Sequence, residues 1–281
     1  MSSSDSQKPV FWKDFTAGYI SGIVNVISGQ PFDNTKVKMV GTKNSFLKTI
    51  STTIKRQGVL SLWAGSSFPI ICFGFCNSIC FSVNEQFKQY FRSKKQNYRL
   101  GLHEFFISGA MAGLANSIIS SPMEHLRIRM AVDVENKFQK SSWKCFTYFY
   151  QNYGIKGLYR GMVITAFREF FLYGAYFAAY SGLRQWGERS DVLWMMFVGG
   201  MGGVSGWMGG FAFDNIKTRY QTDDLSNLKY KSWRDLKPVL KFSKLTEGFS
   251  AGFIRGFPVN ALTFYSFELA MNFFYKNKSV K

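Results

Sequence analysis

The sequence predicts an all-α membrane protein with six transmembrane helices in three pseudo-threefold repeats, each repeat with a short amphipathic surface helix. Three observations predict this fold class. The chain holds apolar runs of membrane-spanning length, a charged motif recurs at an almost constant offset, and an amphipathic stretch follows each copy of the motif. We therefore expect a single domain over residues 1–281, with repeats at approximately 11–97, 98–190 and 191–276.

Six apolar stretches are the candidate spans. Four of them contain no Asp, Glu, Lys or Arg, and these are residues 15–32, 66–83, 105–123 and 192–213. Each is close to the roughly 20 residues that a helix needs to cross the hydrocarbon core. Two more stretches, 161–183 and 249–267, are nearly as apolar but carry charged residues inside them. Basic and polar segments join the six stretches, so we expect each stretch to cross the membrane once.

The basic excess of the chain fits a membrane setting. The formal net charge is +18, and aromatic residues make up 18% of the sequence. Lys and Arg flank membrane spans and bind anionic head groups. Here they are spread through the loops and form no stripe or motif for nucleic acid, so we expect no nucleic-acid partner. The Ser-rich N-terminus, residues 1–7, lacks the pattern of a secretory signal.

Candidate catalytic and metal-ligating residues are few, and we expect no enzyme, no cofactor and no metal site. His103 and His125 stand at span ends without a nucleophile or a metal cluster around them. Cys72, Cys76 and Cys80 share one face of the second span at i, i+4 and i+8. Metal ligation is one interpretation of these thiols, but no fourth ligand stands nearby. Small polarizable residues pack well between helices, so packing is favoured.

A charged motif ends the first, third and fifth spans. Its copies start at Pro31, Pro122 and Ala212, which are 91 and 90 residues apart. An acid follows two residues after each start, and bases follow after five and seven residues. Acid and first base stand three residues apart, so they share a helix face. Pro removes a backbone hydrogen bond and bends a helix, so Pro31 and Pro122 are candidate kinks that would bring the helix ends together. We expect the surface helices at 44–56, 139–152 and 232–244.

Where these helix ends meet, each acid could meet a base from the next repeat. The expected pairs are Asp33 with Arg127, Glu124 with Lys217, and Asp214 with Lys36. A closed ring of three ion pairs is a gate. Exposed ion pairs contribute only about 0–1 kcal/mol each, which suits a gate that opens repeatedly. The alternative is that these are ordinary charges at helix ends, but three copies at a near-constant offset favour the gate.

These residues resemble the mitochondrial carrier family, whose signature is Pro-x-acid-x-x-base in three repeats. The resemblance covers nearly the whole chain, from about Phe11 to Tyr275. It implies that the ring closes the matrix side, that a second network on the even-numbered helices closes the cytosolic side, and that the protein alternates between the two closures. It also implies a multi-pass protein of the mitochondrial inner membrane with both termini facing the intermembrane space.

The second network of the family follows the pattern aromatic-acid-x-x-base near the end of each even-numbered helix. Its charged members in this chain are Glu85, Lys88, Arg184 and Glu268. The pairs that the family implies are Glu85 with Arg184 and Glu268 with Lys88. The third pair has lost both partners, since Ser181 and Met271 occupy those positions. No charge is therefore left uncompensated, as a real network would require.

The matrix-side ring departs from the family pattern in two ways. Ala212 stands where the family has its third Pro. The family often has Gln one turn past the motif as a brace, and Gln221 keeps it while Val40 and Ala131 do not. We expect a ring that is complete in charge but weakly braced.

Charged residues inside spans cost about 2.5–3.5 kcal/mol each on insertion scales, so they are functional candidates by default. Arg168, Glu169 and Arg255 are the clearest of them. In the family the corresponding positions contact substrate, and the same register adds Cys72 and Phe73 on the second helix. The resemblance to the ornithine, basic amino acid and carnitine/acylcarnitine branch implies that Arg255 holds a carboxylate and that Glu169 meets an ammonium or quaternary amine. Arg168 would balance Glu169 or bind a second acidic group; alternatively, Arg168 and Glu169 only neutralise each other.

Two functions stay open on the sequence. The first is a solute transporter that works by alternating access on an amino-acid-like or carnitine-like zwitterion, because Glu169 is the lone candidate carboxylate for a dibasic substrate. The second is a transport-inactive protein of the same fold that serves as a structural subunit of a larger inner-membrane (respiratory) complex, which the lost Pro and the lost cytosolic pair suggest. The expected partners are a small-molecule solute, membrane lipids such as cardiolipin at the surface helices and, in the second case, other inner-membrane proteins.

Overall fold

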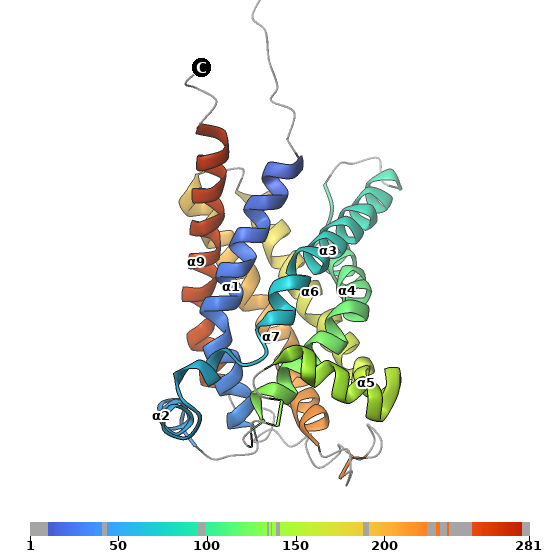
Figure 1. Cartoon of the computed structure of the whole chain (residues 1–281). Coiled ribbons are helices and arrows are strands. Elements are labelled where there is room, and N and C mark those ends of the chain that lie inside the picture. Colours follow the sequence, from blue (N-terminus) through green and yellow to red (C-terminus); the bar gives the residue numbers. More distant parts are fainter. Residues whose placement is uncertain are drawn as a thin grey trace, which may run out of the picture.

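The computed structural model describes residues 11–40, 44–94, 99–133, 135, 137–138, 141–187, 191–223, 229–230, 235 and 249–276. Every regular element in these ranges is a helix (Figure 1). The elements of the first repeat are α1 (Phe11–Met39), α2 (Phe46–Gln57), the 3-10 helix η1 (Val59–Trp63) and α3 (Ser67–Ser93). Those of the second are α4 (Leu102–Ala131), α5 (Ser142–Leu158) and α6 (Met162–Trp186). The third repeat contributes α7 (Val192–Thr222) and α9 (Phe249–Lys276).

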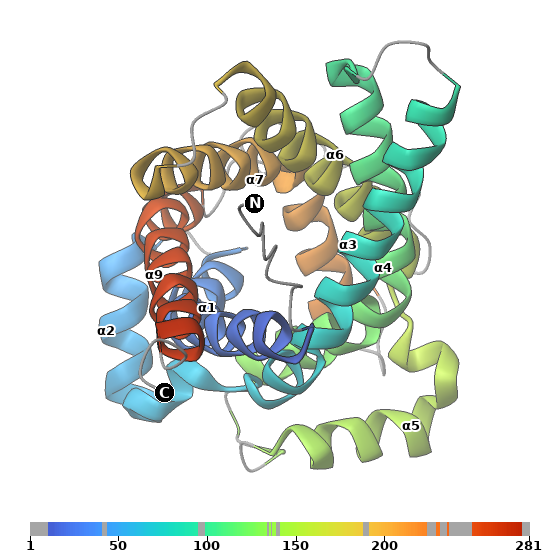
Figure 2. The same ribbon diagram turned by 90° about the horizontal axis from the view of Figure 1, so that it is seen from above.

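The six long helices surround a common axis, as the view along that axis shows (Figure 2). Each packs against its neighbours in the order α1, α3, α4, α6, α7, α9, and α9 returns to α1. The helices α2 and α5 lie outside this circle of helices, at one end of the bundle (Figure 1). They occupy two of the three positions where surface helices were predicted. The third predicted stretch, 232–244, lies outside the described residues except for Asp235.

Glycines let neighbouring helices approach closely. A Cβ at Gly109 or Gly113 of α4 would lie 2.3 Å from a carbonyl oxygen of α6. On α7, a Cβ at Gly209 would lie 2.7 Å from the carbonyl oxygen of Phe171. Spacing of small residues by four permits such approach, because no side chain separates the two backbones. The glycine-rich α7 therefore packs tightly against α6.

Turns at corresponding places in two repeats require glycine. Gly65 precedes α3 with φ 79°, and Gly161 precedes α6 with φ 83°. Only glycine adopts such positive φ values without steric cost. The Gly65 turn lies against α4, where a Cβ would be 3.1 Å from the Cα atom of Arg127. These turns fix where α3 and α6 begin relative to the charged ends of α4 and α7.

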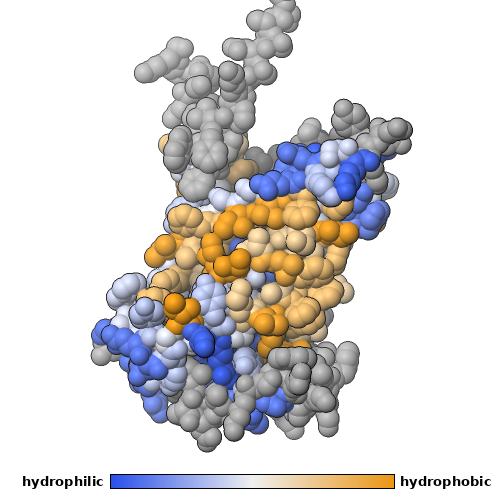
Figure 3. All heavy atoms as spheres, turned by 90° about the vertical axis from the view of Figure 1, so that its right-hand side faces the viewer, coloured by the Kyte–Doolittle hydropathy of each residue, from blue (hydrophilic) through white to orange (hydrophobic). Residues whose placement is uncertain are grey.

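The outer surface carries an apolar band between two hydrophilic ends (Figure 3). Ile71, Phe75, Ile118 and Val163 are large apolar residues that remain exposed on the long helices. Contiguous exposed apolar surface of this kind marks a contact with lipid or with another protein. One helical stretch of the described residues, Val59–Ser93, is long and apolar enough to cross a membrane by length and composition. The other long helices carry Gly, Ser, Asn and Gln among their apolar residues, and these lower their average hydropathy.

Candidate functional site

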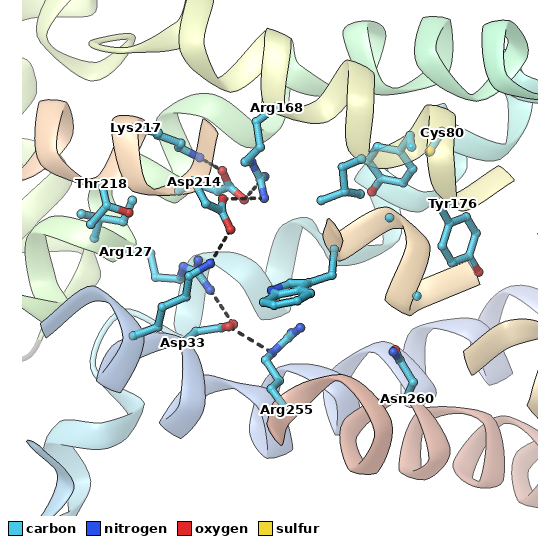
Figure 4. A pocket seen from close by; sticks show the side chains of 18 of the residues that line it. Asp33, Cys80, Arg127, Arg168, Tyr176, Asp214, Lys217, Thr218, Arg255 and Asn260 are labelled. Atoms are coloured by element: carbon cyan, nitrogen blue, oxygen red, sulfur yellow. Dashed lines mark hydrogen bonds and ion pairs between the residues drawn. The ribbon is translucent and has the colours of Figure 1, made fainter. Parts of the chain in front are cut away.

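The charged ends of α1, α4 and α7 converge at one end of the bundle. Lys36 Nζ lies 2.6 Å from Asp214 Oδ2, and Arg127 Nη1 lies 2.9 Å from Asp33 Oδ2. Lys217 forms an ion pair with Glu124. These are the three pairs that the motif predicts, and each joins two different repeats. Figure 4 labels Asp33, Arg127, Asp214 and Lys217 among them. We call these six residues the ion-pair ring.

Burial changes the energetics of the ring. All six side chains are buried or half-buried, with Lys217 the least exposed. The value of about 0–1 kcal/mol applies to solvent-exposed pairs, so the expectation of weak pairs is wrong for this ring. Removing one partner of a buried pair costs about 3–5 kcal/mol, because a charge is left without compensation in a low-dielectric site. Each ring residue therefore depends on its partner from another repeat.

Arg168 of α6 joins two of the three ring pairs. Its guanidinium lies 2.7 Å from Glu124 Oε1 and 3.4 Å from Asp214 Oδ1. It also forms an ion pair with its neighbour Glu169. A planar guanidinium with five N–H donors can contact several carboxylates at once. Arg168 is thus part of the ring's charge network as well as of the cavity wall.

Arg255 of α9 joins the third ring pair. Its Nε lies 3.0 Å from Asp33 Oδ1, while Arg127 contacts the other oxygen of the same carboxylate. The side chain of Arg255 is 29% exposed, more than that of any other cation in this network. Gly29 leaves room for it, since a Cβ there would lie 2.9 Å from Arg255 Nη2. Each acid of the ring therefore has two cationic partners, one from the ring and one from α6 or α9.

A cavity of about 380 Å³ opens above the ring. Arg168 and Arg255 line it together with aromatic, amide and thiol side chains from α3, α6, α7 and α9, none of which was a predicted solute contact. These are Asn77, Cys80, Phe81, Tyr173, Tyr176, Trp207 and Asn260. Helical spacing could have found part of this set, because Glu169, Tyr173 and Tyr176 stand at i, i+4 and i+7 on one face of α6. The volume and the mixture of apolar and polar side chains suit a small solute.

Three of the five predicted contact residues lie off this wall. Phe73 packs on α1, where a Cβ at Gly22 would lie 1.9 Å from its ring. Cys72 is half-buried and is also absent from the lining residues. Asn77 takes the part of α3 that faces the cavity, and Cys72 is rotated from it by roughly 140° at 3.6 residues per turn. Glu169 is 3% exposed and stands behind Arg168, so it does not reach the cavity wall either.

The opposite end of the bundle carries charged residues that do not pair between helices in the described part of the chain. Glu85 is half exposed, and its cationic partners are Arg92 at 3.4 Å and Lys88 at 3.9 Å, both on its own helix. Arg184 donates to the Tyr180 hydroxyl at 3.0 Å, also within one helix. Lys88 Nζ lies 5.7 Å and 5.6 Å from the ring centres of Phe105 and Phe177. The expected pair Glu85–Arg184 is not formed in this conformation, and the side chain of Glu268 lies outside the described residues.

In the first two motif copies, a polar residue three positions after the start anchors the ring from behind. The amide of Asn34 donates to the carbonyl oxygens of Leu62 and Ala64 at 2.9 and 3.0 Å. In the second repeat, His125 Nδ1 lies 3.3 Å from the carbonyl oxygen of Leu158. The recurrence of Asn, His and Asn at this position of the motif is the sequence signal for these anchors.

Hydrogen bonds support both the predicted brace, Gln221, and the helix around the predicted kink at Pro31. Gln221 donates from Nε2 to the carbonyl oxygen of Arg160 at 2.9 Å, which ties α7 to the turn before α6. Pro31 lies inside α1 and Pro122 inside α4. Because Pro31 has no N–H, the carbonyl oxygen of Ile27 loses its helical partner. The indole N–H of Trp63 donates to that oxygen at 2.8 Å.

Comparisons with known proteins agree with the repeated motif. A family model described as mitochondrial carrier protein matches residues 7–95, 99–191 and 188–278. A glutamate/glycine mitochondrial carrier of Schizosaccharomyces pombe is 34% identical over 91% of this chain and 92% of its own length. A mitochondrial glycine transporter of Saccharomyces cerevisiae is 32% identical over 92% and 90%. A mitochondrial basic amino acids transporter of Rattus norvegicus is 29% identical over 92% and 89%. With three repeats matched along nearly its whole length, the chain belongs to the mitochondrial carrier protein family.

Proposed function

We propose that this chain is a transporter of amino-acid-like solutes that spans the mitochondrial inner membrane six times and works by alternating access. The observation that carries the proposal is the asymmetry of the bundle. Ion pairs between repeats close one end, while Glu85 and Arg184 at the other end pair within their own helices. Both ends of the described chain, at Phe11 and Lys276, lie away from the ring. With the ring toward the matrix, both termini face the intermembrane space.

Transport in this proposal exchanges one closure for the other. The solute enters the cavity from the open end, and the ion pairs of the ring then separate. At the open end α3 and α6 move together, so that Glu85 meets Arg184. The two closures form in turn. A carrier that stayed closed at both ends would release no solute, and one open at both ends would leak. The lost pairs at one closure are compensated by the pairs gained at the other and by contacts to the solute.

Arg255 is the proposed receptor for the solute carboxylate. It is the most exposed cation of the network, and its partner Asp33 keeps Arg127 when Arg255 leaves. A carboxylate of the solute can therefore replace Asp33 at Arg255 without leaving either arginine unpaired. Charge-assisted hydrogen bonds to a guanidinium are the strongest contacts available to a carboxylate. The exchange removes one of the two cations that hold Asp33 at the ring, which couples binding to opening.

The relatives support an amino acid as the solute, because their names specify glutamate, glycine or basic amino acids. They give no support to a transport-inactive structural subunit. The cavity of about 380 Å³ fits a solute of amino-acid size.

The test is uptake of radiolabelled amino acids by purified protein in liposomes. We expect saturable uptake by the natural protein and a loss of at least about tenfold in Arg255→Gln, since 1.4 kcal/mol of lost binding is a factor of ten. Lys48→Gln is the matched control, because it removes one exposed cation on α2, outside the cavity. Unchanged uptake in Arg255→Gln removes Arg255 from the mechanism. Absence of uptake of every amino acid tested by the natural protein contradicts the transport function itself.

A further inference from the structure

A second cavity lies at the ring end of the bundle, between α2 and the ends of α1, α4 and α7. Its volume of about 370 Å³ is large enough for a small molecule. All three repeats form its wall. The first contributes the end of α1 and one face of α2, the second Val132 after α4, and the third Thr222 at the end of α7. We call this cavity the ring-end pocket, and the proposed transport assigns no role to it.

The charges of the ring-end pocket have one sign. Lys38 and Arg56 are its cations, and no carboxylate stands among the described residues that line it. Asp133 adjoins the wall, but its carboxylate accepts the backbone N–H groups of Lys137 and Phe138 at 2.9 and 3.0 Å. That carboxylate is therefore used within its own turn. A concave site lined by charges of one sign attracts ions of the opposite sign, so this pocket favours an anion.

The face of α2 that lines the pocket carries hydroxyl groups beside its arginine. Thr49, Thr52, Thr53 and Arg56 stand at i, i+3, i+4 and i+7, so they share one face of the helix. The hydroxyl of Thr49 donates to the carbonyl oxygen of Ser45 at 2.9 Å, within the same turn. The hydroxyls of Thr52 and Thr53 and the guanidinium of Arg56 are then the donors of this face. An oxyanion accepts hydrogen bonds from both kinds of group.

Lys38 is the second base of the first motif copy, and its surroundings differ from those of the second base of the next copy. Arg129 donates to two carbonyl oxygens at the end of α7, at 3.4 and 2.5 Å. Lys38 donates to the side-chain oxygen of Gln57 at 2.7 Å. Gln57 is a neutral amide, so it accepts this bond without compensating the charge. An ammonium group has three N–H donors and can hold an anion as well as Gln57.

We propose that the ring-end pocket binds a small dianion of the phosphate type, either free phosphate or the phosphate group of a water-soluble molecule. Lys38 and Arg56 compensate its two charges, and the threonine hydroxyls of α2 donate to its oxygens. Because the wall needs the ends of α1, α4 and α7 together, the pocket is complete only while the ion-pair ring is closed. The bound dianion therefore stabilises the closed ring. The binding site goes beyond the proposed transport and does not depend on it.

The experiment is thermal unfolding of detergent-purified protein with inorganic phosphate as the probe and chloride at the same ionic strength as the reference. We expect the apparent melting temperature of the natural protein to rise saturably with phosphate. Lys38→Gln and Arg56→Gln should each raise the half-saturating concentration by at least about tenfold, as 1.4 kcal/mol of lost binding gives. Lys55→Gln is the matched control, because it removes an exposed cation of α2 that does not line the pocket.

Gln57→Glu separates binding from folding. The new carboxylate takes the place of an amide oxygen that lies 2.7 Å from Lys38 Nζ, so it pairs with Lys38 and repels an anion. We expect this variant to lose its response to phosphate while its melting temperature in chloride stays equal to that of the natural protein or rises. A merely structural role of Lys38 predicts something else. Lys38→Gln would then lower the melting temperature in chloride and keep the natural response to phosphate.

The effect on the ring is measured by transport. Uptake of labelled glutamate into liposomes with phosphate on both sides should be slower than uptake in chloride at the same ionic strength. Gln57→Glu should remove this difference. Equal uptake in both salts, together with a thermal response to phosphate, would overturn the effect on the ring and keep the binding site.

The remaining outcomes distinguish this inference from the proposed function. A thermal response that is the same in chloride, or that persists in Gln57→Glu, overturns the site. A response to phosphatidylglycerol that Gln57→Glu removes, without one to phosphate, identifies a lipid site and also overturns the proposal. If Lys38→Gln fails to fold, Gln57→Glu decides. A natural protein that responds to phosphate but takes up no amino acid contradicts the transport function and leaves the site intact.

Discussion

At the end of the bundle where α1, α4 and α7 meet, Lys217 pairs with Glu124 of another repeat, whereas at the opposite end Lys88 approaches Glu85 of its own helix at 3.9 Å. Both ends carry acids and bases three residues apart. The difference lies in which helices are close enough for these side chains to meet. The same charge pattern pairs between repeats at one end and within one helix at the other, so in the proposed transport cycle the pairing identifies the conformation.

The largest expected effect compares the same substitution at the two ends. Lys217→Ala leaves the buried carboxylate of Glu124 with Arg168 alone, so we expect it to lower the free energy of unfolding by about 3 kcal/mol. Lys88→Ala removes a cation that packs over two aromatic rings, and we expect a loss of about 1 kcal/mol or less. Thermal unfolding in detergent measures both. Equal losses in the two variants would show that the two ends do not differ in the way described.

A second prediction concerns the pair Glu85–Arg184, which is not formed in this conformation. Arg184→Gln breaks no pair between helices here, so its free energy of unfolding should equal that of the natural protein within about 0.5 kcal/mol. The variant should nevertheless reduce the uptake rate by about fivefold, because a lost pair worth about 1 kcal/mol changes a population by that factor. Glu85→Gln should have the same effect, and the double variant no more than either one. Additive losses would contradict pairing between the two residues.

The smallest expected effect reports on the packing behind the ring. Cys145 of α5 is fully buried in a cluster with Leu126 and Met130 of α4. Burial raises the pKa of the Cys145 thiol from 9.0 to about 12. Because maleimides react with the thiolate, a variant that keeps Cys145 alone among the four cysteines should label slowly at pH 7.

The sign of the pH dependence follows from the raised pKa. The folded state disfavours the thiolate, so this group adds no pH dependence below pH 9 and destabilises the fold as the pH rises from 9 toward 12. Labelling should speed up in Lys217→Ala, which loosens the ring end, and stay slow in Lys88→Ala. Rapid labelling of the natural sequence at neutral pH would mean that α5 does not stay packed on α4.

The ring pairs were predictable from the sequence because their geometry is local and repeated. Acid and base three residues apart share a helix face, and the near-constant offset of the motif places three such faces around one axis. The anchors Asn34 and His125 could also have been found, since a polar residue recurs at that position of the motif. The residue of α3 that faces the cavity could not be predicted, because a count of residues along a helix does not give the rotation of that helix relative to the other five long helices. Asn77 rather than Cys72 faces the cavity for that reason.

The sequence by itself determined the three repeats, the family and the partners within the ion-pair ring, because all of these follow from residue order and helical period. Only the tertiary structure decided which side chains Arg168, Glu169 and Arg255 contact. A long arginine side chain can reach several carboxylates, and the carboxylate that it contacts depends on the distances between helices from different repeats. Those distances bring Arg168 onto two ring acids and over Glu169, and they bring Arg255 onto Asp33. Arg168 and Arg255, which the family resemblance implies as solute contacts, are therefore tied to the ion-pair ring.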